Sequence, residues 1–141
     1  MRYSKRGLAL TEGFEGLKLE AYWDRNGWAI GYGHRSGIVQ GMTCTREQAE
    51  AWLGQDIAWA ESVVDRYVTV PVTQGEYDAM VDFCFNLGSD RFEHSTLLEL
   101  VDQGKIPEAA AEFEKWDKMG GKEVAGLLRR RLAEKDEFLH G

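Results

Sequence analysis

The chain has 141 residues, which is enough for one compact domain or for two small lobes that share a core. Apolar residues make up 43% of it, with 5 Trp, 5 Tyr and 6 Phe, and this share excludes a disordered chain. The formal net charge of −7 argues against a generic nucleic-acid binder, because such proteins are usually basic. The sequence holds no apolar run of about 18 residues and its first residues lack an apolar signal region, so we expect neither membrane insertion nor a signal peptide.

The N-terminal part of the chain predicts a short helix followed by a small sheet. The helix is expected over residues 4–13, with Ser4 as its N-cap. From Leu17 to about Thr43, glycines separate short β-prone segments with the sequences LEAYW, WAIGY and GIVQ. This pattern is typical of an antiparallel sheet of two or three strands.

A long helix is predicted next, at about residues 45–67. Thr45 and Gln48 have the spacing of a capping box, and apolar residues then recur every three or four positions. At 1.5 Å per residue this helix would be about 34 Å long, which is enough to connect two lobes. Thr73 and Glu76 repeat the capping-box spacing at the start of the following helix.

The remainder of the chain is predicted to be helical. Gly88, Gly104 and the Gly120–Gly121 pair separate the segments, and Pro107 fits the first turn of one of them. The predicted helices lie at about 74–87, 95–103, 107–117 and 124–139. The fold class is therefore α+β, with a small N-terminal sheet lobe, a connecting helix and a larger helical lobe.

Cysteines and histidines give no sign of a disulfide or a metal centre. We expect Cys44 and Cys84 to be unbonded thiols, because one lies at the sheet-to-helix junction and the other in an apolar helix of the other lobe. A disulfide requires Cα atoms within about 7 Å of each other. His34, His94 and His140 are single and far apart in the sequence, which argues against a metal site.

Charge is unevenly distributed along the C-terminal third. Residues 93–117 carry seven acids and two lysines, whereas residues 118–135 carry six basic residues and two acids. One interpretation is that these are solvated helix faces. The alternative is that the basic stretch, above all Arg129, Arg130 and Arg131, attracts an anionic polymer.

Two carboxylates stand out as candidates for catalysis. Glu15 lies at the end of the first predicted helix, in GFEGLKL, and Asp24 follows nine residues later at the end of LEAYWD. A helix end and a strand end can face each other across a cleft. Glycoside hydrolysis uses two such carboxylates, one to protonate the leaving oxygen and one to activate water or stabilise positive charge. Spacing alone leaves open that they are two ordinary surface acids among 24.

The motifs around these residues continue along the chain. FEGLKLEAYWD and WAIGYGH are followed by GMTCTREQAEAWLGQDI, TQGEYDAMVDFCFNLG, FEHSTLL and EFEKWDKMGGKEVAGLLRRRLAE. In this order, and over almost the whole chain, they resemble the phage-type lysozymes, the endolysin muramidases of glycoside hydrolase family 24. The resemblance implies one lysozyme-like domain over residues 1–141. Its sheet lobe would span about 14–44, its connecting helix about 45–67, and its helical lobe about 71–141 packed with the N-terminal helix.

The resemblance also assigns catalytic positions. Glu15 matches the family's catalytic Glu, and Asp24 matches its catalytic Asp. The family usually has a Thr just before the IGYGH-type turn, and this chain has Ala29 there. The spacer from Asp24 to this position is one residue shorter than in many members of the family. The family Thr helps to hold the attacking water in place, and an alanine methyl forms no hydrogen bond to that water. Arg130 or Arg131 is a candidate partner for Glu15.

Other family positions map onto the cleft and the lobe junction. The family pattern implies that His34 pairs with Asp56 and clamps the sheet lobe to the connecting helix. It places Phe92 and Ser95 in a segment near the cleft that binds substrate, and Tyr32, which has a glycine on either side, is a candidate apolar platform for a sugar ring. The residues by themselves also allow plainer roles, with Tyr32 as an ordinary strand residue and either Ser95 or Thr96 as a helix cap.

The resemblance implies a muramidase that hydrolyses the β-1,4 bond between N-acetylmuramic acid and N-acetylglucosamine of bacterial peptidoglycan and lyses the cell. It implies no cofactor, no metal and a monomer. The enzyme would collect in the host cytoplasm until a holin releases it to the cell wall, or would act from a phage tail. Ala29 leaves two alternatives open: a lytic transglycosylase acting on the same bond without water, and a peptidoglycan-binding protein with little turnover.

Overall fold

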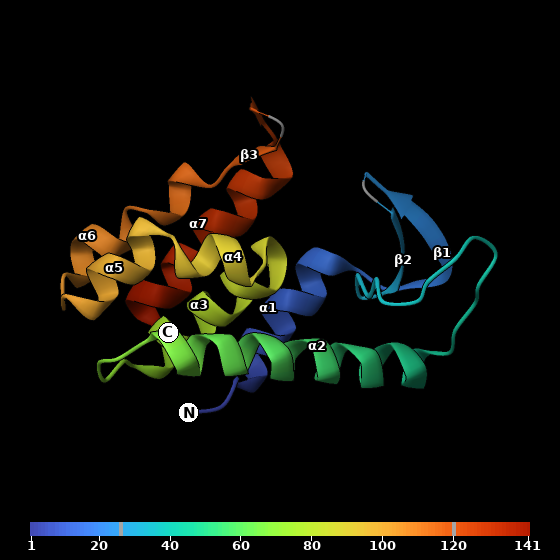
Figure 1. The fold of residues 1–141 in the computed structure, drawn as a ribbon, viewed down its shortest axis with the longest axis horizontal. Coiled ribbons are helices and arrows are strands. Elements are labelled where there is room, and N and C mark those ends of the chain that lie inside the picture. Colours follow the sequence, from blue (N-terminus) through green and yellow to red (C-terminus); the bar gives the residue numbers. More distant parts are fainter. Residues whose placement is uncertain (26, 120) are drawn as a thin grey trace.

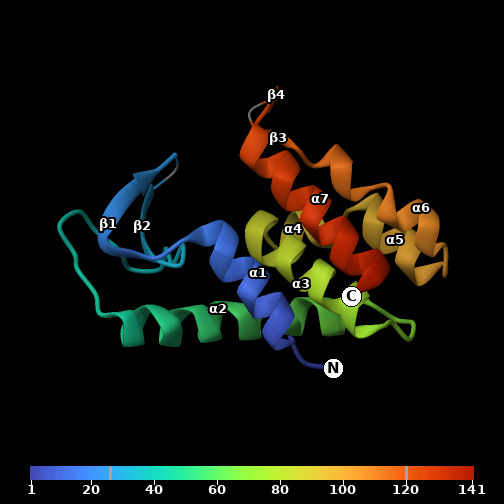
Figure 2. The ribbon, with the colours of Figure 1, turned by 180° about the vertical axis from the view of Figure 1, so that it is seen from behind.

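The computed structural model describes residues 1–25, 27–119 and 121–141, so Gly120 of the predicted Gly120–Gly121 break lies outside the described residues. The ribbon has a β-hairpin near one end of a long helix and a group of helices at the other end (Figure 1). The opposite view shows helix α1 (Lys5–Glu15) between the hairpin and the helical group (Figure 2). This is the predicted α+β arrangement of a sheet lobe, a connecting helix and a helical lobe.

The N-terminal helix and the hairpin form where the sequence predicts them. The Ser4 side chain accepts a hydrogen bond from the Gly7 backbone N–H and so caps α1. Strand β1 (Lys18–Asp24) pairs antiparallel with strand β2 (Gly27–Gly31). Both α1 and β1 therefore end on a carboxylate, Glu15 in the helix and Asp24 in the strand.

The segment between the hairpin and the long helix is a loop bridged to the sheet. Residues 37–40, a candidate third strand, form turn and loop instead. Gly37 and Gly41 adopt left-handed backbone angles, with φ of +73° and +87°, which end an extended segment on both sides. A single bridge between Glu20 and Thr43 connects this loop to β1.

Two capped helices form the middle of the molecule. Helix α2 (Arg46–Tyr67) begins after Thr45, whose hydroxyl accepts a hydrogen bond from the backbone N–H three residues on. Helix α3 (Gln74–Leu87) begins with the complete predicted capping box between Thr73 and Glu76. Because α3 packs against α2 on one side and the C-terminal helix on the other, it is buried along most of its length.

The helical lobe is divided more finely than the sequence predicts. The remaining elements are helices α4 (Ser89–Glu93), α5 (Thr96–Asp102) and α6 (Ile106–Ala110), a 3-10 turn (Phe113–Lys115), strands β3 (Lys118–Met119) and β4 (Lys122–Glu123), and helix α7 (Ala125–His140). The helix predicted over 107–117 is thus split, and α4 and the β3–β4 hairpin were not predicted. Elements of two to five residues are too short to show a hydrophobic period.

Phe83 of α3 lies at the centre of an aromatic core. The rings of Phe92, Phe113 and Trp116 meet it edge to face, with centroid distances of 6.3, 5.7 and 5.6 Å. Phe92 is fully buried. Because α4 packs this ring onto Phe83 and away from the surface, Phe92 belongs to the core, and the substrate-binding role implied for it stays a prediction.

Both cysteines are free thiols, as predicted. Cys84 is buried within α3, and this burial raises its pKa to about 12, so the thiol stays protonated and unreactive. Burial also raises the pKa of Cys44, which is half-buried at the start of α2. In the described part of the chain, no helix has both the length and the apolar character that crossing a bilayer requires.

Candidate active site

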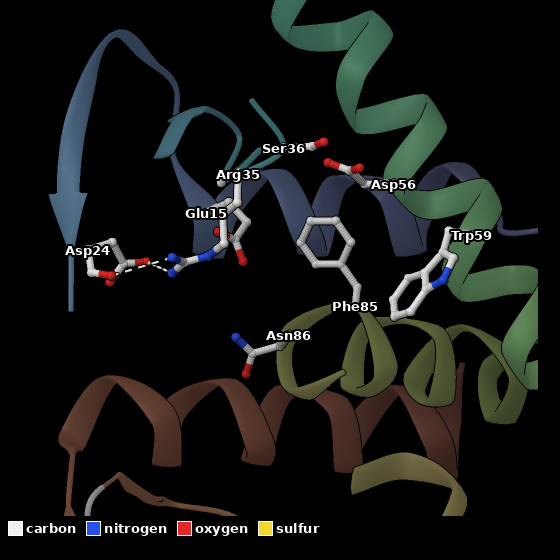
Figure 3. Close-up of a pocket in the computed structure, with 9 residues that line it drawn as sticks. Glu15, Asp24, Arg35, Ser36, Asp56, Trp59, Phe85 and Asn86 are labelled. Atoms are coloured by element: carbon white, nitrogen blue, oxygen red, sulfur yellow. Dashed lines mark hydrogen bonds and ion pairs between the residues drawn. The ribbon is translucent and has the colours of Figure 1, made fainter. Parts of the chain in front are cut away.

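A pocket of about 260 Å³ lies between the hairpin, α2 and α3. Figure 3 shows Asp24, Arg35 and Glu15 along one stretch of it, with the rings of Phe85 and Trp59 farther along. The two carboxylates singled out in the sequence therefore line the same cavity. The lining residues are Glu15, Asp24, Gly33, Arg35, Ser36, Asp56, Trp59, Phe85 and Asn86.

Glu15 is the last residue of α1, and an arginine of α7 holds its side chain. The Arg130 Nη1 atom donates to Glu15 Oε2 at 2.6 Å. The Glu15 side chain is 16% exposed and that of Arg130 only 6%. The guanidinium also lies over the Phe14 ring, 5.6 Å from its centroid. Of the two candidate partners for Glu15, the structure selects Arg130.

Arg130 belongs to a buried ion cluster between α3 and α7. Its Nε and Nη2 atoms donate to the Asp82 carboxylate at 2.9 and 2.8 Å, and the Thr11 hydroxyl donates to it at 2.7 Å. Beside this pair, Arg131 Nε lies 2.7 Å from Glu134 Oε1, and both side chains are fully buried. Arg130 and Arg131 are therefore internal ion-pair partners, which corrects the expectation of a solvated or polymer-facing surface at these two positions.

The two acids at the centre of this cluster have opposite pKa shifts. Burial alone would raise the pKa of Asp82, but a hydrogen bond from Glu134 and the Arg130 charge outweigh burial and lower the pKa to about 2. Complete burial raises the pKa of Glu134 well above its usual value, although Arg131 opposes this shift. Asp82 is therefore ionised at neutral pH, whereas complete burial disfavours ionisation of Glu134.

Asp24, at the end of β1, is paired with Arg35. Arg35 Nη2 donates to the Asp24 carboxylate, and Nη1 donates to the Asp24 backbone carbonyl at 3.4 Å. Tyr22 lies near both candidate carboxylates: burial raises its pKa, and the Glu15 and Asp24 charges raise it further. The sequence did not single out Arg35 or Tyr22.

The predicted pair between His34 and Asp56 is formed. His34 Nδ1 lies 2.9 Å from Asp56 Oδ2, which connects the loop after β2 to the middle of α2. The imidazole also stacks on Trp52 of α2, with a centroid distance of 4.7 Å and an interplanar angle of 6°. His34 is 8% exposed, so the contact joins the two elements from within the structure.

Three other expected site residues lie away from the pocket lining. Ala29 is fully buried in β2, opposite Tyr22 of β1. Tyr32 is 6% exposed, and its hydroxyl faces Glu12 of α1 rather than the pocket. Ser95 caps α5 by accepting a hydrogen bond from the backbone N–H three residues on, which is the plainer of its two expected roles. Both side chains are buried in structural contacts, and their substrate-binding role stays a prediction.

Comparison with known proteins shows the family to which this chain belongs. The Phage lysozyme family matches residues 12–134. The chain belongs to the phage lysozyme family. It is 43% identical to the endolysin of Acyrthosiphon pisum secondary endosymbiont phage 1, over 98% of both chains, and 35% identical to the endolysin of Salmonella phage P22, over 99% of both. Its fold is similar to that of the muramidase domain of SpmX from Asticaccaulis excentricus, with a TM-score of 0.92 and 37% identity over 99% of both chains.

Membership of the phage lysozyme family makes this chain a glycosidase, and the pocket provides what such an enzyme needs. Two carboxylates enter it from different elements, each with its own arginine. Trp59, which is 47% exposed, and Phe85 add aromatic surface. Trp59 and Phe85 could not be identified as site residues from the sequence, because an aromatic residue at helical spacing is more often part of a core.

Gly33→Ala is expected to lower lysozyme activity about a hundredfold while destabilising the fold by only about 1 kcal/mol. A Cβ atom at Gly33 would lie 2.5 Å from Glu15 Oε1, so the flexible carboxylate must move. Gly33 also has a φ of +79°, which an alanine adopts at a cost. Steady-state wall lysis and thermal unfolding measure the two effects.

The matched control is Gly37→Ala. Gly37 has a similar φ of +73°, but a Cβ atom added there would have no other atom within 4 Å. The Gly37→Ala variant should therefore lose about as much stability as Gly33→Ala and keep the wild-type activity. Equal activities of the two variants would show that the position of Glu15 does not depend on Gly33.

Proposed function

We propose that this protein is a muramidase that hydrolyses the β-1,4 bond between N-acetylmuramic acid and N-acetylglucosamine in bacterial peptidoglycan. The observation that supports it is the arrangement of Glu15 and Asp24 in one pocket, each fixed by a different arginine. Two carboxylates flanking a glycosidic bond are the machinery of this reaction. The family relationship supports the same chemistry.

Glu15 is the general acid in this proposal. It donates its proton to the glycosidic oxygen as the bond to the anomeric carbon breaks. Arg130 holds the Glu15 side chain at the end of α1, and Asp82 holds Arg130 in turn. This chain of contacts keeps the carboxyl group aimed into the pocket, because the guanidinium between the two acids is itself buried.

Asp24 activates or orients the attacking water, or stabilises the oxocarbenium-like transition state. Arg35 orients the Asp24 carboxylate and balances its charge while no sugar is bound. We propose inversion of the anomeric configuration, with the water between the two carboxyl groups. Inversion requires a separation of roughly 6.5–9.5 Å between them.

The products of purified peptidoglycan test the proposal. A hydrolase adds water and leaves reducing muramic-acid ends, whereas a lytic transglycosylase leaves 1,6-anhydro ends that lack this water. Mass spectrometry of the released fragments separates the two. Fragments with reducing muramic-acid ends are expected; anhydro ends, or binding to the walls without any release of fragments, would contradict hydrolysis.

Ala29→Thr is expected to raise kcat two- to tenfold with little change in KM. Ala29 lies opposite Tyr22, and alternation along β1 puts Tyr22 and Asp24 on the same face of the sheet, so the new hydroxyl is added on the face of the hairpin that carries Asp24. One neutral hydrogen bond contributes roughly 0.5–1.5 kcal/mol, and about 1.36 kcal/mol is a factor of ten in rate. Because Ala29 is fully buried, the extra atoms cost stability of about 1–3 kcal/mol.

Ala29→Val is the matched control, since valine has the shape of threonine without the hydroxyl. Lysis of purified walls is measured at equal concentrations of folded enzyme. A rise in kcat for the threonine variant alone is the expected result. An unchanged kcat in a folded Ala29→Thr protein would mean that other groups position the water, or that water is not the nucleophile.

We further propose that the protein works as a monomer, without a cofactor, on the glycan strands of the cell wall. Release from the host cytoplasm would depend on a holin. Relatives described as endolysins support the wall as the site of action. Sedimentation of the purified protein would test the monomer, and lysis by enzyme treated with a chelator would test the absence of a metal requirement.

A further inference from the structure

Two hydroxyl groups continue the ion cluster beyond its charged members. Thr11 lies on α1, one helical turn before Glu15, and is fully buried. Its Oγ1 atom lies 2.7 Å from Asp82 Oδ1 on one side and 2.7 Å from the Tyr3 hydroxyl on the other. Neither Thr11 nor Tyr3 is among the described residues that line the catalytic pocket, so an effect on the reaction has to pass through other groups.

The chemistry of these groups fixes the direction of their hydrogen bonds. Asp82 is ionised at neutral pH and can only accept, so the Thr11 hydroxyl donates its proton to this carboxylate. The Gly7 carbonyl is a more distant acceptor, 3.3 Å from Thr11 Oγ1. With the Thr11 proton used in this way, the Tyr3 hydroxyl is the donor to Thr11. Burial raises the pKa of Tyr3, so the hydroxyl keeps the proton that it donates.

The hydrogen bonds close into a ring across three helices. Asp82 of α3 accepts from Thr11 and from Arg130, and Arg130 of α7 donates to Glu15. Thr11 and Glu15 both belong to α1, and residues four positions apart lie on the same face of a helix. Helix α1 is therefore held by the cluster at two points one turn apart, and one of these points is the proposed general acid.

The Tyr3 side chain is itself held where it meets Thr11. The Tyr3 backbone N–H donates to Glu61 Oε2 of α2 at 2.7 Å. The ring lies so close to the first turn of α1 that a Cβ atom at Gly7 would be 2.4 Å from its Cε1 atom. A glycine within a helix is unfavourable relative to alanine, and here it makes room for the ring. The Tyr3 hydroxyl therefore reaches Thr11 from a defined position.

We propose that Thr11 and Tyr3 are positioning residues for the general acid. Thr11 fixes the Asp82 carboxylate, Asp82 orients the Arg130 guanidinium, and Arg130 holds Glu15. The Tyr3 hydroxyl keeps Thr11 in its donating orientation. The proposal rests on the proposed function, because it takes Glu15 to be the general acid. A displaced acid slows the reaction, whereas the surface that binds substrate is unchanged, so kcat should fall without a change in KM.

Removal of single hydroxyl groups tests these roles. Thr11→Val keeps the shape of threonine and is expected to lower the kcat of wall lysis about tenfold with KM unchanged. Thr11→Ser keeps the hydroxyl and should retain a kcat close to that of the wild type. Tyr3→Phe should lower kcat about threefold. The variant that combines Tyr3→Phe with Thr11→Val should be no slower than Thr11→Val alone, because both changes act through the same link.

Thr73→Val is the matched control. The Thr73 hydroxyl caps α3, the helix that carries Asp82, so its loss lowers stability but leaves the cluster intact. This variant should keep the wild-type kcat at equal concentrations of folded protein. A wild-type kcat in folded Thr11→Val would overturn the positioning role, as would equal losses in Thr11→Val and Thr11→Ser, or a raised KM with kcat unchanged. If Thr11→Val does not fold, the kcat of Tyr3→Phe decides in the same way.

The outcome is separable from that of the proposed function. If the wild type releases reducing ends and Thr11→Val keeps the wild-type kcat, only the positioning role fails. If the ends are anhydro, hydrolysis fails, and the kcat ratios still report on the acid, because the same glycosidic oxygen must be protonated. If no fragments appear, the unfolding of Thr11→Val, Glu15→Gln and their combination decides. Effects that are non-additive by more than about twofold in the unfolding equilibrium constant would support the ring, and additive effects would overturn it.

Discussion

Glu15→Gln is expected to lower the rate of wall lysis by about 10²–10⁴ and to leave the fold intact. Glutamine has nearly the shape of glutamate but delivers no proton to the leaving oxygen. Its carbonyl oxygen still accepts the hydrogen bond from Arg130 Nη1, which in the wild type is 2.6 Å long. Arg130 also keeps both hydrogen bonds to Asp82, so the ion cluster stays formed.

The matched control for this variant is Glu12→Gln. Glu12 lies on the same helix one turn earlier, faces Tyr32 and does not line the catalytic pocket. Lysis of purified peptidoglycan at equal concentrations of folded protein is the measurement, with thermal unfolding of both variants alongside. If Glu15→Gln retains more than about a tenth of the wild-type rate, Glu15 is not the general acid.

The elements that could be predicted are those whose determinants lie close together in the sequence. The caps at Ser4, Thr45 and Thr73 depend on residues three positions apart, and all three form. The long helix α2 shows many turns of its hydrophobic period before it ends at Tyr67. The five-residue α4 offers no such repeat, so it was missed.

The two carboxylates could be predicted because each lies at the end of a recognisable element. Their partners could not be chosen from sequence alone. Arg130 is 115 positions from Glu15, and which of two neighbouring arginines reaches it depends on how α7 turns toward α1 and α3. Arg35 follows the expected strand end by eleven positions, and only the loop geometry brings it back to Asp24.

Burial of the expected substrate-binding aromatics could not be predicted from the sequence. Phe92 and Tyr32 are large aromatics next to motifs near the cleft, and a sequence does not show which face of a short element turns inward. Phe92 packs on Phe83, and Tyr32 faces Glu12. The exposed aromatic of the hairpin, Trp23, looks the same in the sequence but has the opposite environment.

Asp82→Asn is expected to destabilise the folded protein by about 3–5 kcal/mol at pH 7, because the buried Arg130 guanidinium loses the negative charge that faces its Nε and Nη2 atoms. Asp82 is fully buried and accepts hydrogen bonds from Arg130 and Thr11. Glu15 would remain as the only acid within hydrogen-bond distance of Arg130 among the described residues. Denaturant unfolding measures the effect, and Asp136→Asn, at an exposed position of α7, is the control expected to change stability by less than about 0.5 kcal/mol.

The same variant should show a distinctive pH dependence. Burial opposes ionisation of Asp82, but the hydrogen bond from Glu134 and the charge of Arg130 prevail and lower its pKa from 3.8 to about 2. Because the folded pKa lies below the unfolded one, this stabilisation is fully present above pH 3.8 and is lost as pH falls toward 2. The difference in unfolding free energy between wild type and Asp82→Asn should therefore be about 1 kcal/mol smaller at pH 3 than at pH 7. A difference that stays constant or grows on acidification would mean that Asp82 is not the ionised centre of the cluster, and that Glu134 carries the charge instead.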